Sequence, residues 1–378
     1  MKASFSVGSR QIGEGFPCFI IVEISGNHHQ KYEEAERLVR AAKDAGADAV
    51  KLQTYTADTI TLKSDKEYFF IKGKDQPETW KRRTLYELYE EAHTPWEWQP
   101  KLKAIADELG LVFFSSPFDD SAVDFLEAMG VALHKVASYE LVHIPLLRHI
   151  ARTKKPVIMS TGFASREEIA LALQTLREGR SGDIALLHCV TAYSEKPRMA
   201  EMNLATIKDM KESFGVVAGF SDNNAGMLAP IIAATAAGAS IIEKHLTLDR
   251  RAGGPDARFS LEPQEFKDMI TRIRRGEREG TAQAIAEIGG VQDISTAIGS
   301  VHYGPASERE AENIFFRPSV WVNKRMRKGD VFTLDTVRVA RPNGGLPPKD
   351  LDSIVGRRAA ADIDAATPLT EALVSKSR

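Results

Sequence analysis

Eight short apolar runs constrain the fold of this chain more than any other feature. The runs are FIIVEIS (19–25), AVKLQTY (49–55), VFFSSPF (112–118), LHKVASYE (133–140), PVIMSTG (156–162), IALLHCV (184–190), VVAGFSD (216–222) and IIEKHLT (241–247). Segments with helical periodicity, such as YEEAERLVRAAKDAGA, lie between most of them. Strands that alternate with helices pair in parallel, and eight such units over roughly 275 residues predict an α/β fold with a closed (β/α)8 TIM barrel.

An open, doubly wound sheet is the competing arrangement. Such a sheet normally carries a glycine fingerprint after its first strand. The first run instead ends in Ser25 and continues into GNHH (26–29), which does not have that pattern. The closed barrel is therefore the preferred prediction.

The sequence changes character twice after the eighth run. The barrel is expected to occupy residues 1–275, and residues 276–312 are polar with few large apolar side chains, which indicates a linker. In residues 313–378 the segments RMRKGDVFT and DIDAATPLT resemble each other and predict a small β-rich domain. A module of this size is near the limit of independent stability, so we expect it to dock on another surface.

One connection is longer than a crossover helix requires. Residues 56–111, between the second and third runs, are rich in aromatic residues and in charges of both signs. Long connections in compact domains are usually functional or disordered, and the aromatic content argues against disorder. We expect this segment to form a lid or wall over the barrel mouth.

Composition narrows the classes of partner and compartment. The chain has 50 Lys and Arg against 52 Asp and Glu, a net charge of -2, so we expect neither nucleic acid nor a membrane as partner. Cys18 and Cys189 lie in apolar runs and are expected to be buried and unpaired in a reducing compartment. The polar N-terminus and the lack of a run of ~20 apolar residues predict a cytoplasmic protein.

Polar side chains gather at the ends of the predicted strands, where barrel enzymes carry out their chemistry. Residues two apart on a strand share a face, which pairs Lys51 with Gln53, Ser221 with Asn223, and Glu243 with His245. Lysines inside apolar strands are informative because an unpaired buried ion is costly. Lys51 and Lys135 either pair with the acids Glu23, Glu140 or Glu243, or together hold an anionic ligand such as a phosphate-bearing substrate.

Nine motifs carry a family resemblance. They are VEISGNH, AVKLQTYT, FSSPFD, KVASYE, MSTGFAS, LLHCVTAY, GFSDN, GASIIEKHLTLD and GGPDARFSLEP. In order and spacing they resemble the sialic acid synthase family along nearly the whole chain. The C-terminal VARPNGGLPPKD resembles the antifreeze-like (SAF) domain that ends those synthases. SDKEYFFIKG and LYELYEEAHTPWEW are most similar to the branch that makes pseudaminic acid.

The resemblance implies a synthase that condenses phosphoenolpyruvate with the open-chain aldehyde of an N-acetylated amino sugar. The products are a nonulosonic acid and phosphate, and the acceptor of the pseudaminic branch is a 2,4-diacetamido-2,4,6-trideoxy-L-altrose. Three competing functions stay open: an N-acetylneuraminate or legionaminate synthase, a Schiff-base aldolase that uses Lys135, and a sugar- or phosphate-binding scaffold without turnover. The resemblance further implies a domain-swapped homodimer, in which the SAF domain covers the partner's barrel.

The resemblance also assigns roles to residues. The implied catalytic residues are Glu23, Lys51, Lys135, Glu140 and Glu243, with Glu140 expected to orient a lysine. The implied substrate-binding residues are Asn27, Gln53, Ser116, Ser138, Ser160, Tyr193, Ser221, Asp256 and Arg341, of which Arg341 matches the SAF arginine that contacts the acetamido group. Ammonium groups and hydroxyls suit the negative charges of phosphoenolpyruvate.

FSDNN, residues 220–224, departs from the family pattern. Family members typically have a histidine at the position of Asn223, and it binds a divalent metal together with the histidine here numbered His245. An amide oxygen is a weaker ligand that suits hard cations. We expect Mn²⁺, or else Mg²⁺ or Co²⁺, to bind more weakly through His245, Asn223 and substrate oxygens. Two further outcomes are open: Asn224 or His28 replaces the missing ligand, or the site is degenerate.

Overall fold

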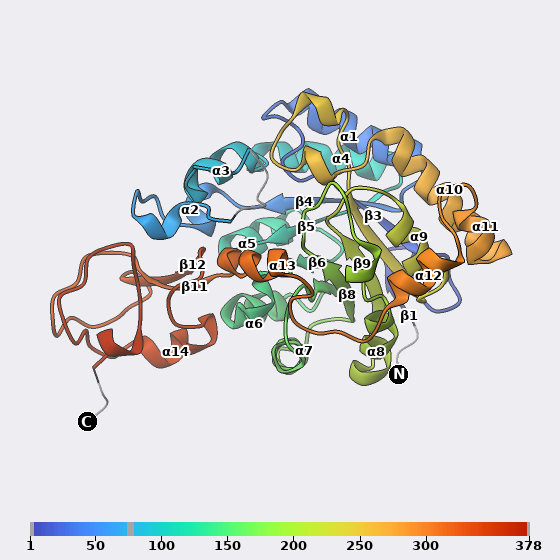
Figure 1. Ribbon diagram of the computed structural model, residues 1–378. Helices are drawn as coiled ribbons and strands as arrows, with labels where there is room; N and C mark the ends of the chain where they lie inside the picture. The colour runs from blue at the N-terminus through green and yellow to red at the C-terminus, as the bar shows by residue number, and fades with distance from the viewer. Residues whose placement is uncertain (1–3, 74–78, 376–378) are drawn as a thin grey trace.

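The computed structural model describes residues 4–73 and 79–375, and in it eight parallel strands close into a barrel (Figure 1). The strands are β3 (Phe19–Glu23), β4 (Ala49–Thr54), β5 (Val112–Pro117), β6 (His134–Val136), β7 (Val157–Ser160), β8 (Ile184–Val190), β9 (Val217–Asp222) and β10 (Ile241–His245). Each strand lies in one of the eight apolar runs, and β10 pairs with β3 to close the ring. The predicted barrel is confirmed.

Eight helices surround the barrel. They are α1 (Tyr32–Ala45), α4 (Gln99–Glu108), α5 (Asp120–Ala128), α6 (Ile144–Arg152), α7 (Arg166–Glu178), α8 (Ala205–Phe214), α9 (Leu228–Thr235) and α10 (Pro263–Glu279). In α1, residues three and four apart such as Leu38, Val39 and Ala42 are buried against the strands, and the helix ends where Gly46 adopts φ 89°. In α7, Ser165 and Glu168 form a capping box that begins the helix.

The strands divide their side chains between two cores. On β3, Ile20 and Val22 pack in the large core between strands and helices, whereas Phe19 and Ile21 pack inside the barrel. A hairpin of β1 (Ser4–Val7) and β2 (Arg10–Gly13) adds Phe5, Val7 and Ile12 to this inner core. The inner face is therefore apolar over the first part of β3 and becomes polar only at its C-terminal end, where Glu23 lies.

The long second connection contains its own elements. They are α2 (Ala57–Ile60), the 3-10 turns η1 (Glu67–Phe69) and η2 (Trp96–Trp98), and α3 (Leu85–Ala92), after which α4 supplies the crossover. Part of the predicted wall, residues 74–78, lies outside the described residues. The aromatic side chains of this segment form a separate core with residues of the barrel mouth, including Tyr55, Tyr89, Phe118 and Tyr139.

Three short helices follow the barrel: α11 (Thr281–Ile285), α12 (Val291–Ile298) and α13 (Glu308–Glu312). The first two pack outside the barrel near α9 (Figure 1). The C-terminal domain has a small sheet in the order β12 (Val337–Ala340), β11 (Ser319–Val322), β13 (Thr367–Pro368), with α14 (Leu351–Ile354) beside it. The boundaries at residues 275 and 312 stay predictions.

The remaining 3-10 turns connect these elements. They are η3 (Glu140–Val142), η4 (Met199–Glu201), η5 (Arg250–Ala252), η6 (Ala257–Phe259), η7 (Asn313–Phe316), η8 (Pro348–Asp350) and η9 (Glu371–Leu373). Over residues 4–73 and 79–375, no helix is both long enough and apolar enough to span a bilayer.

The C-terminal domain docks on the barrel of its own chain. The Arg341 amide donates to the Ile60 carbonyl at 2.9 Å, and the Thr61 hydroxyl donates to the Arg341 carbonyl at 2.7 Å. On another side, Arg317 makes a two-pronged ion pair with Glu168 on α7. These contacts confirm that the small domain docks on another surface, while its dependence on that surface for stability and its exchange between two subunits stay predictions.

Candidate active site

A cavity opens at the C-terminal ends of the barrel strands. It has an internal volume of about 120 Å³, compared with roughly 10–15 Å³ for one water molecule, so it has room for a guest of several heavy atoms. Most of the predicted site residues line it: Glu23, Lys51, Gln53, Lys135, Ser138, Ser160, Tyr193, Ser221, Asn223, Glu243, His245, Asp256 and Arg341. The three pairs expected to share a strand face therefore all meet in one place.

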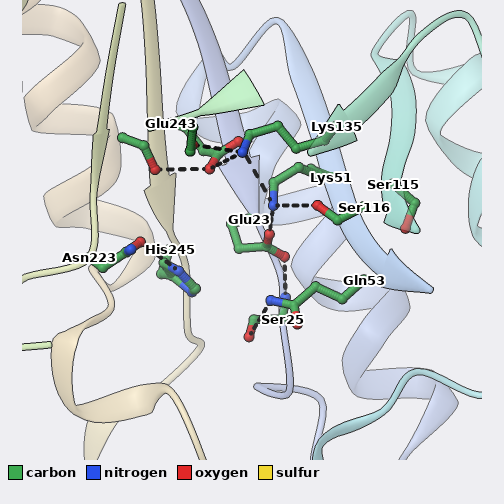
Figure 2. Close-up of polar contacts among 12 residues, drawn as sticks. Glu23, Ser25, Lys51, Gln53, Ser115, Ser116, Lys135, Asn223, Glu243 and His245 are labelled. Carbon is green, nitrogen blue, oxygen red and sulfur yellow. Dashed lines mark hydrogen bonds and ion pairs between the residues drawn. The ribbon is translucent and has the colours of Figure 1, made fainter. Parts of the chain in front are cut away.

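Two lysines approach one carboxylate at the floor of this cavity (Figure 2). Lys51 Nζ lies 3.8 Å from Glu243 Oε2, and Lys135 Nζ lies 3.6 Å from Glu243 Oε1. Lys51 also donates to Glu23, and Lys135 donates to Ser160 Oγ at 2.7 Å. The pairing with acids is therefore confirmed, and because both ammonium groups also face the shared cavity, the binding of an anionic ligand there stays a prediction.

The electrostatics of this cluster differ between its two acids. Burial acts to raise the pKa of Glu243, but the charges of Lys135 and Lys51 outweigh burial and lower that pKa. For Glu23, burial dominates and raises the pKa despite its contact with Lys51. Burial also disfavours the charged form of Lys135, which for a lysine lowers the pKa. Glu243 is therefore the ionised partner with which an incoming anion would compete for both ammonium groups.

Ser25 links two acids of the cavity rim. Its amide donates to Glu23 Oε1 at 2.7 Å, and its hydroxyl donates to Asp256 Oδ2. Burial raises the pKa of Asp256, and the bonds from Ser25 and Gly26 partly oppose that effect. Sequence reasoning missed Ser25, although it lies two residues after Glu23 in the first apolar run.

Two predicted substrate-binding residues do not line the cavity. The side-chain amide of Asn27 donates to the Leu246 carbonyl at 2.8 Å and to Ser260 Oγ at 2.9 Å, so it fastens two loops together. Ser116 lies 3.4 Å from Lys51 Nζ and contacts that ammonium group from outside the cavity lining. A direct substrate contact is not supported for either residue.

Glu140 also has a different partner from the one expected. It accepts two hydrogen bonds from the Arg341 guanidinium and makes no hydrogen bond with a lysine of the described residues. Glu140 begins the turn η3 after β6, which directs its carboxylate toward the docked C-terminal domain. Arg341 additionally donates to Tyr89 OH at 3.1 Å and lies 4.8 Å from the ring centre of Tyr139. The expectation that Glu140 orients a lysine is thereby corrected.

The pair His245 and Asn223 is the candidate metal site. His245 Nε2 lies 3.2 Å from Asn223 Oδ1 (Figure 2). Burial holds the pKa of His245 well below its usual range, so the ring is neutral, and its buried Nδ1 has no hydrogen-bond partner among the described residues. Two neutral donors this close together suit neighbouring ligands of one cation. The described part of the chain contains no cluster of three or more His, Cys, Asp or Glu arranged for a metal, so a cation held by this pair would need further ligands from water or substrate.

Neither proposed replacement for the missing histidine is at the site. His28 Nε2 is hydrogen-bonded to Thr94 Oγ1 at 3.1 Å. The Asn224 amide donates to Asp222 at 3.0 Å and accepts from the Ser194 amide at 3.0 Å. Both side chains are fully buried outside the cavity lining, so neither replacement is supported by the structure.

An apolar and aromatic wall completes the cavity, and sequence reasoning named none of its members individually. The long second connection and its preceding strand end supply Tyr55, Ile60, Trp80, Leu88, Tyr89 and Ala92, and other segments supply Phe118, Tyr139 and Phe316. The predicted wall over the barrel mouth is confirmed for the described residues. Cys189 also lines the cavity, but burial raises the pKa of its thiol to about 11, which makes it a poor nucleophile.

Comparison with known families decides the classification. The NeuB family model matches residues 38–283, and the SAF domain model matches residues 317–375. The chain belongs to the NeuB family. This NeuB-family chain is 39% identical to the pseudaminic acid synthase of Campylobacter jejuni strain 81-176, over 93% of this chain and 95% of that protein. It is 37% identical to the pseudaminic acid synthase of Helicobacter pylori, over 96% of this chain and 99% of that protein.

A solved structure supports the same classification of this NeuB-family chain. The spore coat polysaccharide biosynthesis protein SpsE of Bacillus subtilis is 30% identical and superimposes with a TM-score of 0.81. The match covers 100% of both chains. The barrel and the C-terminal domain therefore form an arrangement that is shared over the full length of that relative.

Proposed function

We propose that this NeuB-family protein condenses phosphoenolpyruvate with the open-chain aldehyde of an N-acetylated amino sugar, as a pseudaminic acid synthase. The observation that carries the proposal is the pair of buried lysines, Lys51 and Lys135, that face one cavity and share Glu243. The identity to two pseudaminic acid synthases over nearly the whole chain supports the choice of product.

The reaction requires one anionic and one neutral substrate in the same cavity. The methylene carbon of phosphoenolpyruvate forms a bond to the aldehyde carbon, whose oxygen takes up a proton. Water is consumed and phosphate leaves, which yields a nine-carbon 2-keto acid. Fixed cations and hydroxyls that face the places where negative charge develops accelerate such a step.

The polar floor suits phosphoenolpyruvate. Lys51 and Lys135 neutralise its charges in place of Glu243, and Ser138, Ser160 and Gln53 lie on the same lining to donate hydrogen bonds. Burial raises the pKa of Glu23, which favours the protonated carboxyl and so suits Glu23 to transfer a proton at the floor of the cavity. The floor therefore has the donors that an enol phosphate with a carboxylate requires.

The wall suits the sugar. Asp256, Tyr193 and Arg341 provide polar groups among aromatic side chains, so they can orient hydroxyl and acetamido groups while the rings pack on methyl groups. A sugar with two acetamido groups and a deoxy carbon buries fewer hydroxyls on this wall than N-acetylmannosamine does. This reasoning favours the pseudaminic acceptor over the acceptor of an N-acetylneuraminate synthase.

The protein's own groups also suit a divalent cation. His245 and Asn223 would hold it, because neutral imidazole and amide oxygen are compatible with Mn²⁺, Mg²⁺ and Co²⁺, and Mn²⁺ is the ion that the family resemblance implies. When bound, such an ion supplies a Lewis acid that polarises the acceptor carbonyl. Because Asn223 stands in place of the histidine expected from the family resemblance, the ion should bind weakly, and a degenerate, non-catalytic family member is the second candidate function.

The proposal includes a domain-swapped homodimer in the cytoplasm. The contact between Arg341 and the barrel can form between two chains as well as within one, and a C-terminal module of this size requires a docking surface. Cys18 and Cys189 are both unpaired and buried, as is usual in a reducing compartment.

A panel of amino sugars, each mixed with phosphoenolpyruvate and one divalent cation, tests the function. Mass spectrometry of the products should show a nonulosonic acid with the 2,4-diacetamido-2,4,6-trideoxy-L-altrose acceptor and smaller amounts with the others. Binding of phosphoenolpyruvate without any product across the whole panel would support the scaffold. Trapping of pyruvate on Lys135 by borohydride would support the aldolase.

A further inference from the structure

Lys244 is a fully buried lysine with no role in the reaction proposed above. It lies on β10 between two cavity residues, Glu243 and His245, but does not itself line the cavity. Alternate residues of a strand face opposite sides, so its side chain extends to the outer side of the barrel. A charged group in this position is unusual and requires an explanation.

The ammonium group of Lys244 binds both neighbours of Asn223. It donates to Asp222 Oδ2 at 2.7 Å and to the Asn224 carbonyl oxygen. Asp222 Oδ1 in turn accepts from the Asn224 backbone amide at 3.1 Å and from its side-chain amide at 3.0 Å. Asp222 and Asn224, the residues before and after Asn223, are therefore both bound to the Lys244 ammonium group behind the cavity.

The same network reaches a second loop. Asn224 Oδ1 accepts from the Ser194 amide at 3.0 Å, and the Ala225 amide donates to the Ser194 carbonyl at 2.8 Å. Ser194 directly follows Tyr193, which lines the cavity with φ 48°, in the left-handed region. Two cavity residues from different loops, Asn223 and Tyr193, thus depend on the network for their backbone positions.

Stability alone does not account for this arrangement. A buried ion pair contributes little net stability relative to apolar residues of the same size, because desolvation offsets the attraction. Burial acts against the charge of Lys244 and lowers its pKa, although Asp222 partly opposes that effect. The hydrogen bonds of the network offset the desolvation of the two charges, and they fix the backbone of the loops that carry Asn223 and Tyr193 directly behind the site.

We propose that Lys244 is a positioning residue that acts through Asp222 and Asn224. It holds Asn223 opposite His245 and keeps Tyr193 at the wall. The inference rests on the proposed function only for its kinetic readout, since the positions of the two loops can be measured without turnover.

The test variant is Asp222→Asn/Lys244→Met, which removes both charges and avoids a single unpaired ion. The matched control is Asp48→Asn/Arg274→Met, which removes a partly buried pair with a 3.0 Å contact at the opposite end of the barrel. Amide hydrogen exchange is followed for residues 222–225, and KM is measured for each substrate. In the test variant we expect exchange at residues 222–225 and KM for the sugar to rise by about tenfold, with KM for phosphoenolpyruvate unchanged within twofold.

The control should leave the exchange of residues 222–225 and both KM values as in the wild type. Wild-type exchange and KM values in a folded Asp222→Asn/Lys244→Met protein would overturn the inference. Parallel changes in the test and control variants would also overturn it, because they would indicate a general loss of stability. Absence of synthase activity in the wild type would count against the proposed function, while hydrogen exchange would still decide the role of Lys244.

Discussion

Arg341 donates two hydrogen bonds to one carboxylate oxygen of Glu140, at 2.6 Å from Nη2 and 3.0 Å from Nε. Both residues are buried, and they are 201 positions apart in the sequence. The pair joins the C-terminal domain to the wall of the barrel cavity. Docking of that domain therefore both covers the mouth and delivers a cationic group to it.

The pair predicts strong energetic coupling between the two domains. Arg341→Met leaves a buried, unpaired carboxylate and should lower the free energy of unfolding by about 3–5 kcal/mol. Glu140→Gln/Arg341→Met should recover part of this loss, with a coupling of about 1–3 kcal/mol. Urea denaturation of the two single variants and the double variant measures the coupling. If the changes in unfolding free energy of the two single variants simply add up in the double variant, the predicted coupling is contradicted.

The domain-swapped dimer predicts complementation between two inactive variants. Lys135→Met disables the barrel floor, and Arg341→Met disables the C-terminal domain that would cover the partner's barrel. After the two variants are denatured, mixed equally and refolded, about half of the dimers are mixed and each has one intact site. Activity should then return to about one quarter of the wild-type value. If the domain covers its own barrel, the mixture stays inactive.

The metal pair predicts a gain of affinity on restoring the second imidazole. Asn223→His should tighten Mn²⁺ binding by at least about tenfold, because imidazole is the stronger ligand for this ion. Electron paramagnetic resonance of free Mn²⁺ measures the change without any turnover. Asn323→His, in the C-terminal domain, adds an imidazole away from the cavity and controls for nonspecific binding. Equal affinities in the wild type and Asn223→His would show that residue 223 does not contact the ion.

Three buried histidines predict a loss of stability in mild acid. Burial lowers the pKa of His28, His143 and His188 to about 4, from the usual 6.5. The unfolded chain therefore binds more protons between pH 6.5 and 4, so this contribution is present above pH 6.5 and is lost as the pH falls toward 4. Each ring contributes on the order of 3 kcal/mol.

A single substitution tests the sign of that pH effect. His143 accepts from the Leu146 amide at 3.2 Å as the N-cap of α6, and asparagine is a good N-cap that does not titrate. His143→Asn should therefore unfold at nearly the wild-type denaturant concentration above pH 6.5 and at a higher concentration than the wild type at pH 4, because it loses less stability between these pH values. A steeper loss in this variant would contradict the argument.

Local physics explains which parts of the site could be predicted. The eight strands and the shared faces of pairs such as Lys51 and Gln53 follow from residue type and the two-residue repeat. That repeat stops where a strand ends: Ser25 adopts φ 54° just after β3, so the direction of the Asn27 side chain depends on a turn. Its contacts with Leu246 and Ser260 arise only when the loops of β3 and β10 meet.

Contacts between segments that are far apart in the sequence could not be predicted from local patterns. Trp80 joins the cavity through a hydrogen bond to the Pro255 carbonyl and through packing on Tyr193 and Phe316, which come from three other parts of the chain. No local pattern specifies which loop aromatic makes such contacts. The partner of Glu140 was missed for the same reason, because a strand-end acid in isolation is equally compatible with a lysine of the barrel.

Titration calorimetry of phosphoenolpyruvate binding tests the central claim most directly. The proteins are the wild type, Lys51→Met, Lys135→Met and, as control, Lys155→Met, whose partly exposed ammonium pairs with Glu127. We predict that each cavity variant, confirmed as folded by circular dichroism, binds about 100-fold more weakly, while the control binds as the wild type does. Affinities within twofold of the wild type for both cavity variants would contradict the claim that these two lysines hold the anionic substrate.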